Sequence, residues 1–303
     1  MIGYDRLGSN GRLGNQMFQY AALRGIATNR NFNWCIPPKD TPSLTNYGLH
    51  DTFKLKHLTQ ENIGIINNTI SSNEQFSFYN LANSNPTIKN RIEKSYEFDE
   101  NIFNTVEDNT NIDGFFQTEK YFKNIESEIR EDFEFIDDIL EPCKEYISQF
   151  SDIIFLHIRR GDNVGREDLC RIPTLDNYYT KALSYFDDNS AVLVCSDDIE
   201  WCKEQAFFDD ERFYLSENTE RYPHKCLDGD NVLRYSTIPY IDLCLMSLCN
   251  GGIIPTSTLS WWGGYLQKNR TNPIIVQDPW FGPTLSYNNT KDLIPEDWIK
   301  LRW

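Results

Sequence analysis

Two adjacent arginines directly follow a short apolar run in the middle of the chain. The segment "DIIFLHIRRGD" (152–162) places Arg159 and Arg160 after this run and Asp162 two residues later. A guanidinium carries a permanent charge and a planar fork of N–H donors, which matches the oxygens of a phosphate. A structural ion pair with Asp162 is the simpler alternative. The residue types alone leave both interpretations open.

Two aspartates end a second apolar run. The segment "AVLVCSDD" (191–198) finishes with Asp197 and Asp198. A carboxylate in this place could accept hydrogen bonds from a guanine edge or from ribose hydroxyls. The alternative is that one of the two acids caps the helix predicted to follow. We expect the capping interpretation to hold for one of them.

Hydroxyl side chains follow a third apolar run, in "IIPTSTLSWWGG" (253–264). They stand at the predicted start of a helix, where unpaired backbone N–H groups attract an anion. Capping of the helix is the alternative, and the two tryptophans that follow are expected to be core residues. The hydroxyls belong to Thr256, Ser257, Thr258 and Ser260.

Each of the three segments follows a predicted strand. Strands alternate with helical patterns throughout the second half of the chain, which indicates βαβ units and a parallel sheet covered on both faces. Ligands of such sheets bind outside the carboxyl ends of the strands. We therefore expect the three segments to surround one crevice. The predicted strands are 152–158, 191–197, 212–217, 251–257 and 273–278.

The first half of the chain begins with a glycine-rich stretch that leads into a helix. In residues 8–30 the apolar positions from Met17 to Ile26 fit one face of a helix. The glycine spacing is neither that of a Walker loop nor that of the dinucleotide fingerprint. A tight turn with close backbone approach to a ligand and a simple turn are both open. Residues 40–110 are polar and weakly periodic, so only loops and short elements are expected there.

The chain of 303 residues carries a formal net charge of −16. This charge excludes general binding to nucleic acids or anionic membranes, because both need a basic face. No stretch approaches the roughly 20 apolar residues of a membrane span, and the N-terminus has no signal-like apolar core. We therefore expect a soluble, cytoplasmic protein. The length fits two domains, which we place at residues 1–150 and 151–303.

Metal and disulfide chemistry find little support in the sequence. The "DGD" of residues 228–230 has the spacing of two metal-binding aspartates, but its polar surroundings favour a plain turn. The four histidines lack metal-ligand spacing. The eight cysteines include no Cys-x-x-Cys pair, and several lie in apolar segments. We expect free thiols and no metal cofactor.

Six segments, taken in order, resemble the alpha-1,2-fucosyltransferases of glycosyltransferase family 11. They span residues 11–266, which is most of the chain. Two departures stand out: Thr256-Ser257-Thr258 replaces the Asn-Ser-Ser common in the family, and "NGG" (250–252) replaces a more polar turn. The matching segments are "GRLGNQMFQYA" (11–21), "GFFQTEKYF" (114–122), "HIRRGD" (157–162), "SDDIEW" (196–201), "DLCLMSLC" (242–249) and "STLSWWGGYL" (257–266).

The resemblance implies an α/β, GT-B-like fold with two Rossmann-like domains. Residues 1–150 would form the acceptor-side domain, and residues 151–303 would bind GDP-fucose. The implied reaction moves L-fucose, with inversion, to the 2-hydroxyl of a galactose-terminated glycan. It also implies that no catalytic metal takes part.

The resemblance also assigns residues to roles. The arginine motif would contact the donor diphosphate, and Asp197 would face the guanosine. Asn15 is similar to an asparagine that faces the reaction centre from the N-terminal half in related fucosyltransferases. The expected catalytic residues are Arg159, Asp162 and Asn15, and the expected donor-binding residues are His157, Arg159, Arg160, Asp197, Ser257, Thr258 and Ser260.

In the expected mechanism, Arg159 stabilises the negative charge that builds on the departing diphosphate. The acceptor hydroxyl must lose a proton, and Asp162 and Glu119 are both candidates for the base. Phe116 belongs to an aromatic segment that could line an acceptor groove, with core packing as the alternative. Two other functions stay open: a protein O-fucosyltransferase and a noncatalytic nucleotide-sugar-binding protein.

Overall fold

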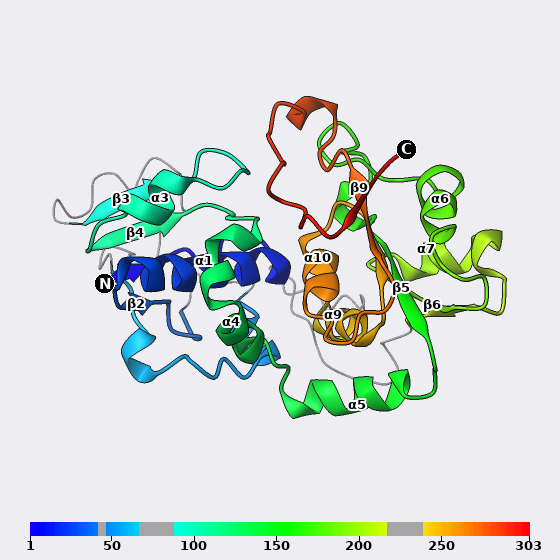
Figure 1. Cartoon of the computed structure of the whole chain (residues 1–303), viewed down its shortest axis with the longest axis horizontal. Coiled ribbons are helices and arrows are strands. Elements are labelled where there is room, and N and C mark those ends of the chain that lie inside the picture. The colour runs from blue at the N-terminus through cyan, green and yellow to red at the C-terminus, as the bar shows by residue number, and fades with distance from the viewer. Residues whose placement is uncertain (42–46, 67–87, 217–238) are drawn as a thin grey trace. The chain divides into compact units, whose positions relative to one another are not determined.

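The computed structural model describes residues 1–41, 47–66, 88–216 and 239–303. These residues form two compact units, and each unit is built around a parallel sheet of its own (Figure 1). The first unit comprises Met1–Glu134 and Asn289–Leu293. The second unit comprises Phe135–Asn288 and Ile294–Trp303.

The division between the units differs from the expected boundary at residue 150. It lies between Glu134 and Phe135, because helix α5 (Asp137–Ile147) packs against helix α9 (Pro239–Leu248) and so belongs to the second unit. The chain also returns once to the first unit, through residues 289–293. There the Asp292 carboxylate accepts hydrogen bonds from the backbone N–H of Phe98 at 3.0 Å and from the Lys120 ammonium at 2.6 Å.

The first unit holds a four-stranded sheet in the order β2-β1-β4-β3, with all neighbours parallel. Helix α1 (Leu13–Arg30) follows β1 and is buried along most of its length, as its apolar spacing predicts. Gly25 lies in the middle of this helix, where a Cβ would stand 1.9 Å from the backbone oxygen of Tyr121. The strands are β1 (Ile2–Gly3), β2 (Trp34–Cys35), β3 (Lys89–Ile92) and β4 (Thr110–Asp113).

Short elements complete the first unit, in agreement with the weak pattern of residues 40–110. The helices are α2 (Leu49–Thr52), α3 (Glu100–Thr105) and α4 (Glu126–Asp132), and the 3₁₀ turns are Gln60–Asn62, Glu119–Tyr121 and Lys123–Ile125.

The second unit holds a six-stranded parallel sheet in the order β10-β9-β8-β5-β6-β7. Five of these strands lie where the apolar runs predict them. The sequence pattern missed β10 at the C-terminus, because its residues alternate between partly buried and exposed. The strands are β5 (Ile153–Ile158), β6 (Ala191–Ser196), β7 (Phe213–Leu215), β8 (Gly252–Ile254), β9 (Ile274–Asp278) and β10 (Ile299–Arg302).

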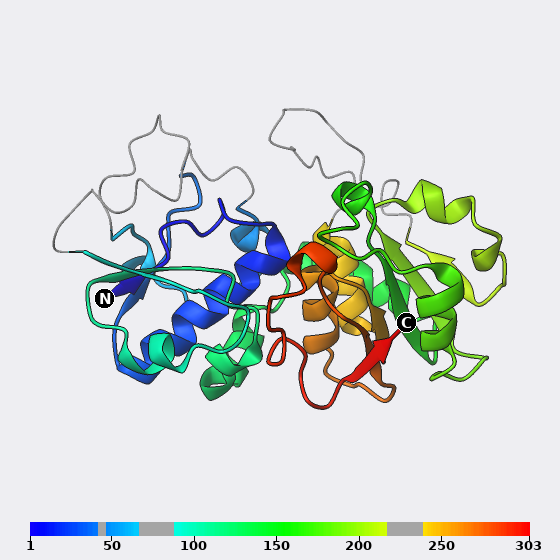
Figure 2. The same ribbon diagram turned by 90° about the horizontal axis from the view of Figure 1, so that it is seen from above.

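The strand order of the second unit reverses between β5 and β8. From β5 the chain builds outward through β6 and β7, and then from β8 outward in the opposite direction. The sheet separates α6 (Thr180–Leu183) and α7 (Ile199–Lys203) on one face from α9 and α10 (Thr258–Tyr265) on the other (Figures 1 and 2). A reversal of this kind opens a crevice at the carboxyl ends of the two central strands.

Four short helical segments complete the second unit. A π-helical segment, Leu175–Tyr179, leads into α6, and 3₁₀ turns occur at Gly161–Asn163, Ala206–Phe208 and Pro283–Leu285. Within the part of the chain that the structure describes, no helix combines the length and apolar character needed to cross a bilayer.

Candidate functional site

The arginine pair and the aspartate pair emerge side by side in the second unit. Strands β5 and β6 are parallel neighbours, and the register pairs Ile158 with Ser196. The next residues along each strand are therefore Arg159 and Arg160 on β5, and Asp197 and Asp198 on β6. The predicted meeting of these two segments at one edge of the sheet is confirmed.

The Arg159 guanidinium contacts two carboxylates, those of Asp162 and Asp197. Its side chain is 17% exposed, whereas the Asp162 side chain is 51% exposed. The guanidinium is thus held at the end of the central strand, and one of its two anionic partners stands largely in solvent. The ion-pair interpretation is thus confirmed for Arg159.

Arg160 is fastened by contacts of a different kind. Its guanidinium carbon lies 4.0 Å from the centroid of the Trp201 ring, a cation–π arrangement. Its Nε donates to Asp198 at 3.0 Å, and its backbone N–H donates to Asp197 at 2.8 Å. Arg160 therefore fixes the turn that presents Arg159. The contact between Trp201 and Arg160 could not be predicted from the sequence, because the two residues are 41 positions apart.

The two aspartates divide the roles that the sequence left open. Asp198 is the N-cap of α7 and accepts from the Trp201 backbone N–H at 3.4 Å. Asp197 instead bridges both arginines of the motif. Gly161 allows this bridge, since a Cβ there would lie 2.3 Å from the Asp197 carboxylate oxygen. Asp197 thus stabilises the turn, and its expected contact with guanosine stays a prediction.

His157 lies on β5 and is 3% exposed. Its neighbours Leu156 and Ile158 belong to the apolar cluster around Tyr178, so His157 faces the opposite side of the sheet, toward α9 and α10. Burial and the nearby Arg159 charge lower the pKa of His157 to about 3. The imidazole is therefore neutral at physiological pH, and it can offer a hydrogen bond beside Arg159 without adding charge.

The hydroxyls after β8 have distinct surroundings. Ser257 is the N-cap residue of α10, yet its side chain makes no capping hydrogen bond. Ser260 is fully buried and donates to the Ser257 carbonyl at 3.3 Å, so its hydroxyl closes the first turn of the helix. Thr256 donates to the Trp280 carbonyl at 2.5 Å. This leaves Ser257 and Thr258 beside the first-turn N–H groups of α10, on the other side of the strand reversal from Arg159. Both tryptophans of the segment are fully buried, as expected.

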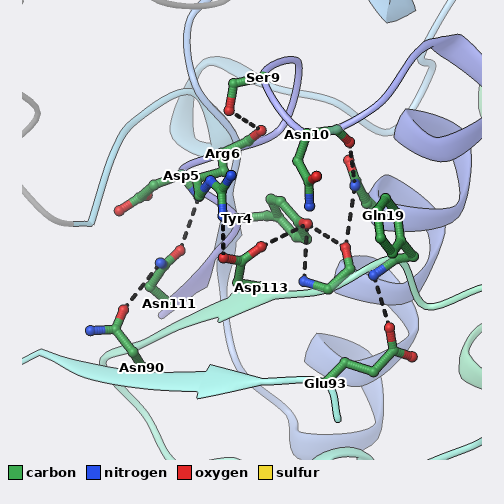
Figure 3. A network of polar contacts seen from close by, with 12 residues as sticks. Tyr4, Asp5, Arg6, Ser9, Asn10, Gln19, Asn90, Glu93, Asn111 and Asp113 are labelled. Carbon is green, nitrogen blue, oxygen red and sulfur yellow. Dashed lines mark hydrogen bonds and ion pairs between the residues drawn. The ribbon is translucent and has the colours of Figure 1, made fainter. Parts of the chain in front are cut away.

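In the first unit, polar side chains tie the loop after β1 to the end of β4 (Figure 3). The Arg6 guanidinium donates to Asp113 at 2.8 Å, and both side chains are at most one tenth exposed. The Tyr4 hydroxyl donates to the Gly114 carbonyl at 2.5 Å. Gln19 on α1 donates to the Asn10 carbonyl at 2.8 Å. The sequence analysis did not predict this network. In the sequence, its charged residues Arg6 and Asp113 simply lie close to apolar ones.

The glycine-rich loop is a tight turn against α1. Gly8 and Gly11 have φ values of +95° and +92°, which favour glycine. A Cβ at Gly11 would lie 2.4 Å from the Asn15 amide nitrogen. Asn15 itself is partly exposed, and its Oδ1 accepts from Gln117 at 3.0 Å. The side chain of Gln117 thus orients the predicted catalytic asparagine.

The two acceptor-side candidates lie in different surroundings, and for Phe116 the core-packing alternative holds. Phe116 is fully buried, with its ring centroid 6.2 Å from that of Tyr4 and 5.1 Å from that of Tyr121, both edge-on. It therefore belongs to the core of the unit. Its neighbour Phe115 is the partly exposed ring. Glu119 pairs with Lys123 at 3.0 Å on the surface of the same unit.

Two sequence observations concern metals and thiols. The "DGD" of residues 228–230 lies outside the described residues. Residues inside the described ranges include no group of three or more His, Cys, Asp or Glu side chains that could hold a metal ion. All cysteines in those ranges are unpaired, in agreement with the expected free thiols.

Comparison with known proteins identifies the family. The sequence model described as glycosyl transferase family 11 matches residues 4–302. The chain therefore belongs to this family and is a glycosyltransferase. The resemblance that its six segments indicate is confirmed.

Two curated relatives have informative names. The chain is 30% identical to an alpha-1,2-colitosyltransferase from Escherichia coli, and the alignment covers 96% of each chain. It is 26% identical to a galactoside 2-alpha-L-fucosyltransferase from Caenorhabditis elegans, over 97% of this chain and 75% of that one.

A solved structure supports the fold. The selenomethionine form of the fucosyltransferase NodZ from Bradyrhizobium matches with a TM-score of 0.50 and 15% identity, over 86% of this chain and 90% of that one. This likeness concerns the fold alone. Together with the two parallel sheets, it confirms the predicted α/β, GT-B-like class.

Proposed function

We propose that this chain transfers L-fucose from GDP-fucose to the 2-hydroxyl of a terminal galactoside, with inversion at the sugar carbon. One observation carries the proposal: the Arg159 guanidinium stands at the carboxyl end of the central strand, where the strand order reverses. The names of the two relatives support the alpha-1,2 linkage and the galactoside acceptor.

Cleavage of the bond between the sugar and the nucleotide leaves negative charge on the β-phosphate. Arg159 and the first-turn N–H groups of α10 flank the reversal, and both favour an anion there. In the proposed complex the diphosphate takes the place of the Asp162 carboxylate on Arg159. A preorganised donor of this kind typically contributes about 3 kcal/mol to the transition state. These groups supply the positive charge, so we propose that no catalytic metal takes part.

The acceptor hydroxyl loses its proton as the new bond forms, so a base is needed. Asp162 is half exposed and stands at the same strand end as Arg159. Glu119 is tied to Lys123 in a local surface pair. These contacts favour Asp162 over Glu119 as the base. Asn15 is proposed to orient the reacting groups from the first unit, with its amide held by Gln117.

A second donor sugar is a specific alternative. One relative is named as a colitosyltransferase. The contacts of Arg159 do not distinguish between donor sugars, because in the proposed complex its guanidinium contacts the diphosphate and not the sugar.

The test is a single panel of incubations followed by linkage analysis. GDP-fucose and GDP-colitose are each offered with lactose, N-acetyllactosamine and other β-galactosides, and folded protein acceptors form a parallel arm. We expect an alpha-1,2-fucosylated galactoside. Preferred transfer from GDP-colitose would redirect the proposal to that donor. Transfer to folded proteins alone would identify a protein O-fucosyltransferase, and GDP binding without any transfer would identify a noncatalytic binding protein.

A further inference from the structure

A buried carboxyl group follows strand β3 in the first unit. The Glu93 Oε2 accepts hydrogen bonds from the backbone N–H groups of Phe115 and Phe116, each at 2.8 Å. Its other oxygen is shielded from solvent. Figure 3 shows Glu93 beside the end of β4, where this turn begins. The carboxyl group thus forms hydrogen bonds with the backbone of residues 115 and 116, which lie beyond the end of strand β4.

The turn fastened by Glu93 has an unusual backbone. Phe116 has a φ of +52°, a conformation that bulky L-residues rarely adopt, and its ring is fully buried. At Gly114 a Cβ would lie 2.5 Å from the Cβ of Glu93. Backbone of this kind persists only where its surroundings hold it, and it is concentrated at functional sites.

The same turn leads directly to the predicted catalytic asparagine. Gln117 is 6% exposed and follows Phe116. Its Nε2 donates to the Asn15 Oδ1 at 3.0 Å. A shift in the backbone at Phe115 and Phe116 would therefore move the amide that orients Asn15.

The charge on Glu93 is costly for the folded chain. The pKa of Glu93 is raised to about 7, mainly by burial and to a smaller extent by the Asp99 carboxylate, although the two backbone N–H groups and the Tyr121 hydroxyl act in the opposite direction. A raised pKa of an acid means that the folded state favours the neutral form. The stability contributed by that form is complete below the usual value near 4.5 and is lost as pH rises through about 7. A glutamine would fill the same space without this charge, but its neutral amide oxygen would accept the two backbone hydrogen bonds more weakly than a carboxylate does.

We propose that Glu93 is a positioning residue of the transferase, whose carboxylate holds residues 114–117 so that Gln117 orients Asn15. This inference rests on the proposed function and on the role of Asn15 in it. Glu93 does not act as the base itself, because both of its oxygens are enclosed within the unit. It acts through the backbone of the turn and the amide of Gln117.

The test compares wild type with Glu93→Gln, with Glu107→Gln as the control. Glu107 pairs with Lys89 at the opposite end of β3, and its side chain is 64% exposed. Unfolding midpoints and the kcat and KM for the acceptor are measured at about pH 5.5 and about pH 8.5, on either side of the Glu93 pKa. We expect Glu93→Gln to be more stable than wild type at the higher pH, with a smaller difference at the lower pH. We also expect its kcat to fall about tenfold or more, because the reacting groups are less well placed.

The pH profile separates positioning from a purely structural role. The kcat of wild type should rise as pH increases through about 7, where the carboxylate forms, whereas that of Glu93→Gln should lack this rise. Glu107→Gln should match wild type throughout. Wild-type kcat and the same pH profile in Glu93→Gln would overturn the inference, and so would a parallel loss of stability and activity at the higher pH. A wild-type chain that transfers no sugar would instead refute the proposed function.

Discussion

Arg159 and Arg160 are neighbours in the sequence, yet their side chains have different surroundings. Arg160 lies over Trp201 and pairs with Asp198, which fixes it within the turn. Arg159 contacts the carboxylates of Asp162 and Asp197, and Asp162 is half exposed. The residue types left an anion site and a structural ion pair both open. They could not show that the two arginines have different roles. This difference depends on the Trp201 ring, which lies on helix α7 and contacts Arg160.

Opposite changes of charge at this site should have opposite effects on nucleotide binding. Arg159→Ala should weaken GDP binding and reduce transfer about a hundredfold or more, because it removes the cation that faces the diphosphate. Asp162→Asn should strengthen GDP binding about two- to fivefold, because it removes an exposed carboxylate that competes for the guanidinium. Calorimetric titration with GDP checks both affinities.

Circular dichroism of both variants serves as the folding control for these titrations. Weaker GDP binding by Asp162→Asn would show that this carboxylate supports the nucleotide site instead of competing for it. Near-normal transfer by Arg159→Ala would remove Arg159 from the mechanism.

Other residues show where the sequence pattern was insufficient. The aromatic segment 114–122 left an acceptor groove and core packing both open, and the structure buries Phe116 while Phe115 is partly exposed. Glu93 lies in the weakly patterned region 40–110, so nothing in its neighbourhood distinguishes it from a surface charge. The burial of Glu93 could not be predicted from the neighbouring sequence, because the turn that buries it lies more than 20 residues further along the chain.

At the scale of elements, five of the six strands of the second unit were predictable, whereas the short strands of the first unit were not. β5 and β6 are apolar runs of six residues each, long enough to be recognised. β1 and β2 have two residues each, which is too short for any periodicity. Helix α1 was predictable from its apolar spacing, although the close approach at Gly25 was not.

That close approach gives a prediction about α1. Gly→Ala in a helix usually stabilises by about 1 kcal/mol. At Gly25 the new methyl would stand 1.9 Å from the Tyr121 backbone oxygen, which cannot move away as a side chain could. We therefore expect Gly25→Ala to lower the free energy of unfolding by about 1–3 kcal/mol.

Urea denaturation of the full chain measures the effect of Gly25→Ala. Thr28→Ala, at an exposed position of the same helix, is the control and should change stability by less than about 0.5 kcal/mol. A stabilised Gly25→Ala variant would show that α1 and the turn after Thr118 can separate at little cost.

At the scale of the whole molecule, the chain has a net charge of −16, whereas the proposed reaction needs a positive charge beside the diphosphate. The proposed mechanism draws its positive charge from one guanidinium and one helix terminus. Transfer should therefore continue at an unchanged rate in excess EDTA, measured as product formed from GDP-fucose. Activity that is lost in EDTA and restored by Mn²⁺ would require a metal in the reaction.

The route of the chain between the two units also has a consequence for engineering. The chain passes from one unit to the other three times, because residues 289–293 return to the first unit. Asp292 in this segment holds both Phe98 and Lys120. In a chimera, residues 1–134 could be replaced by the corresponding part of another family member. Residues 289–293 would then still come from this chain, and they would not match the new first unit. Exchange of the complete first unit between family members therefore needs three matched junctions, one near Glu134 and one at each end of residues 289–293.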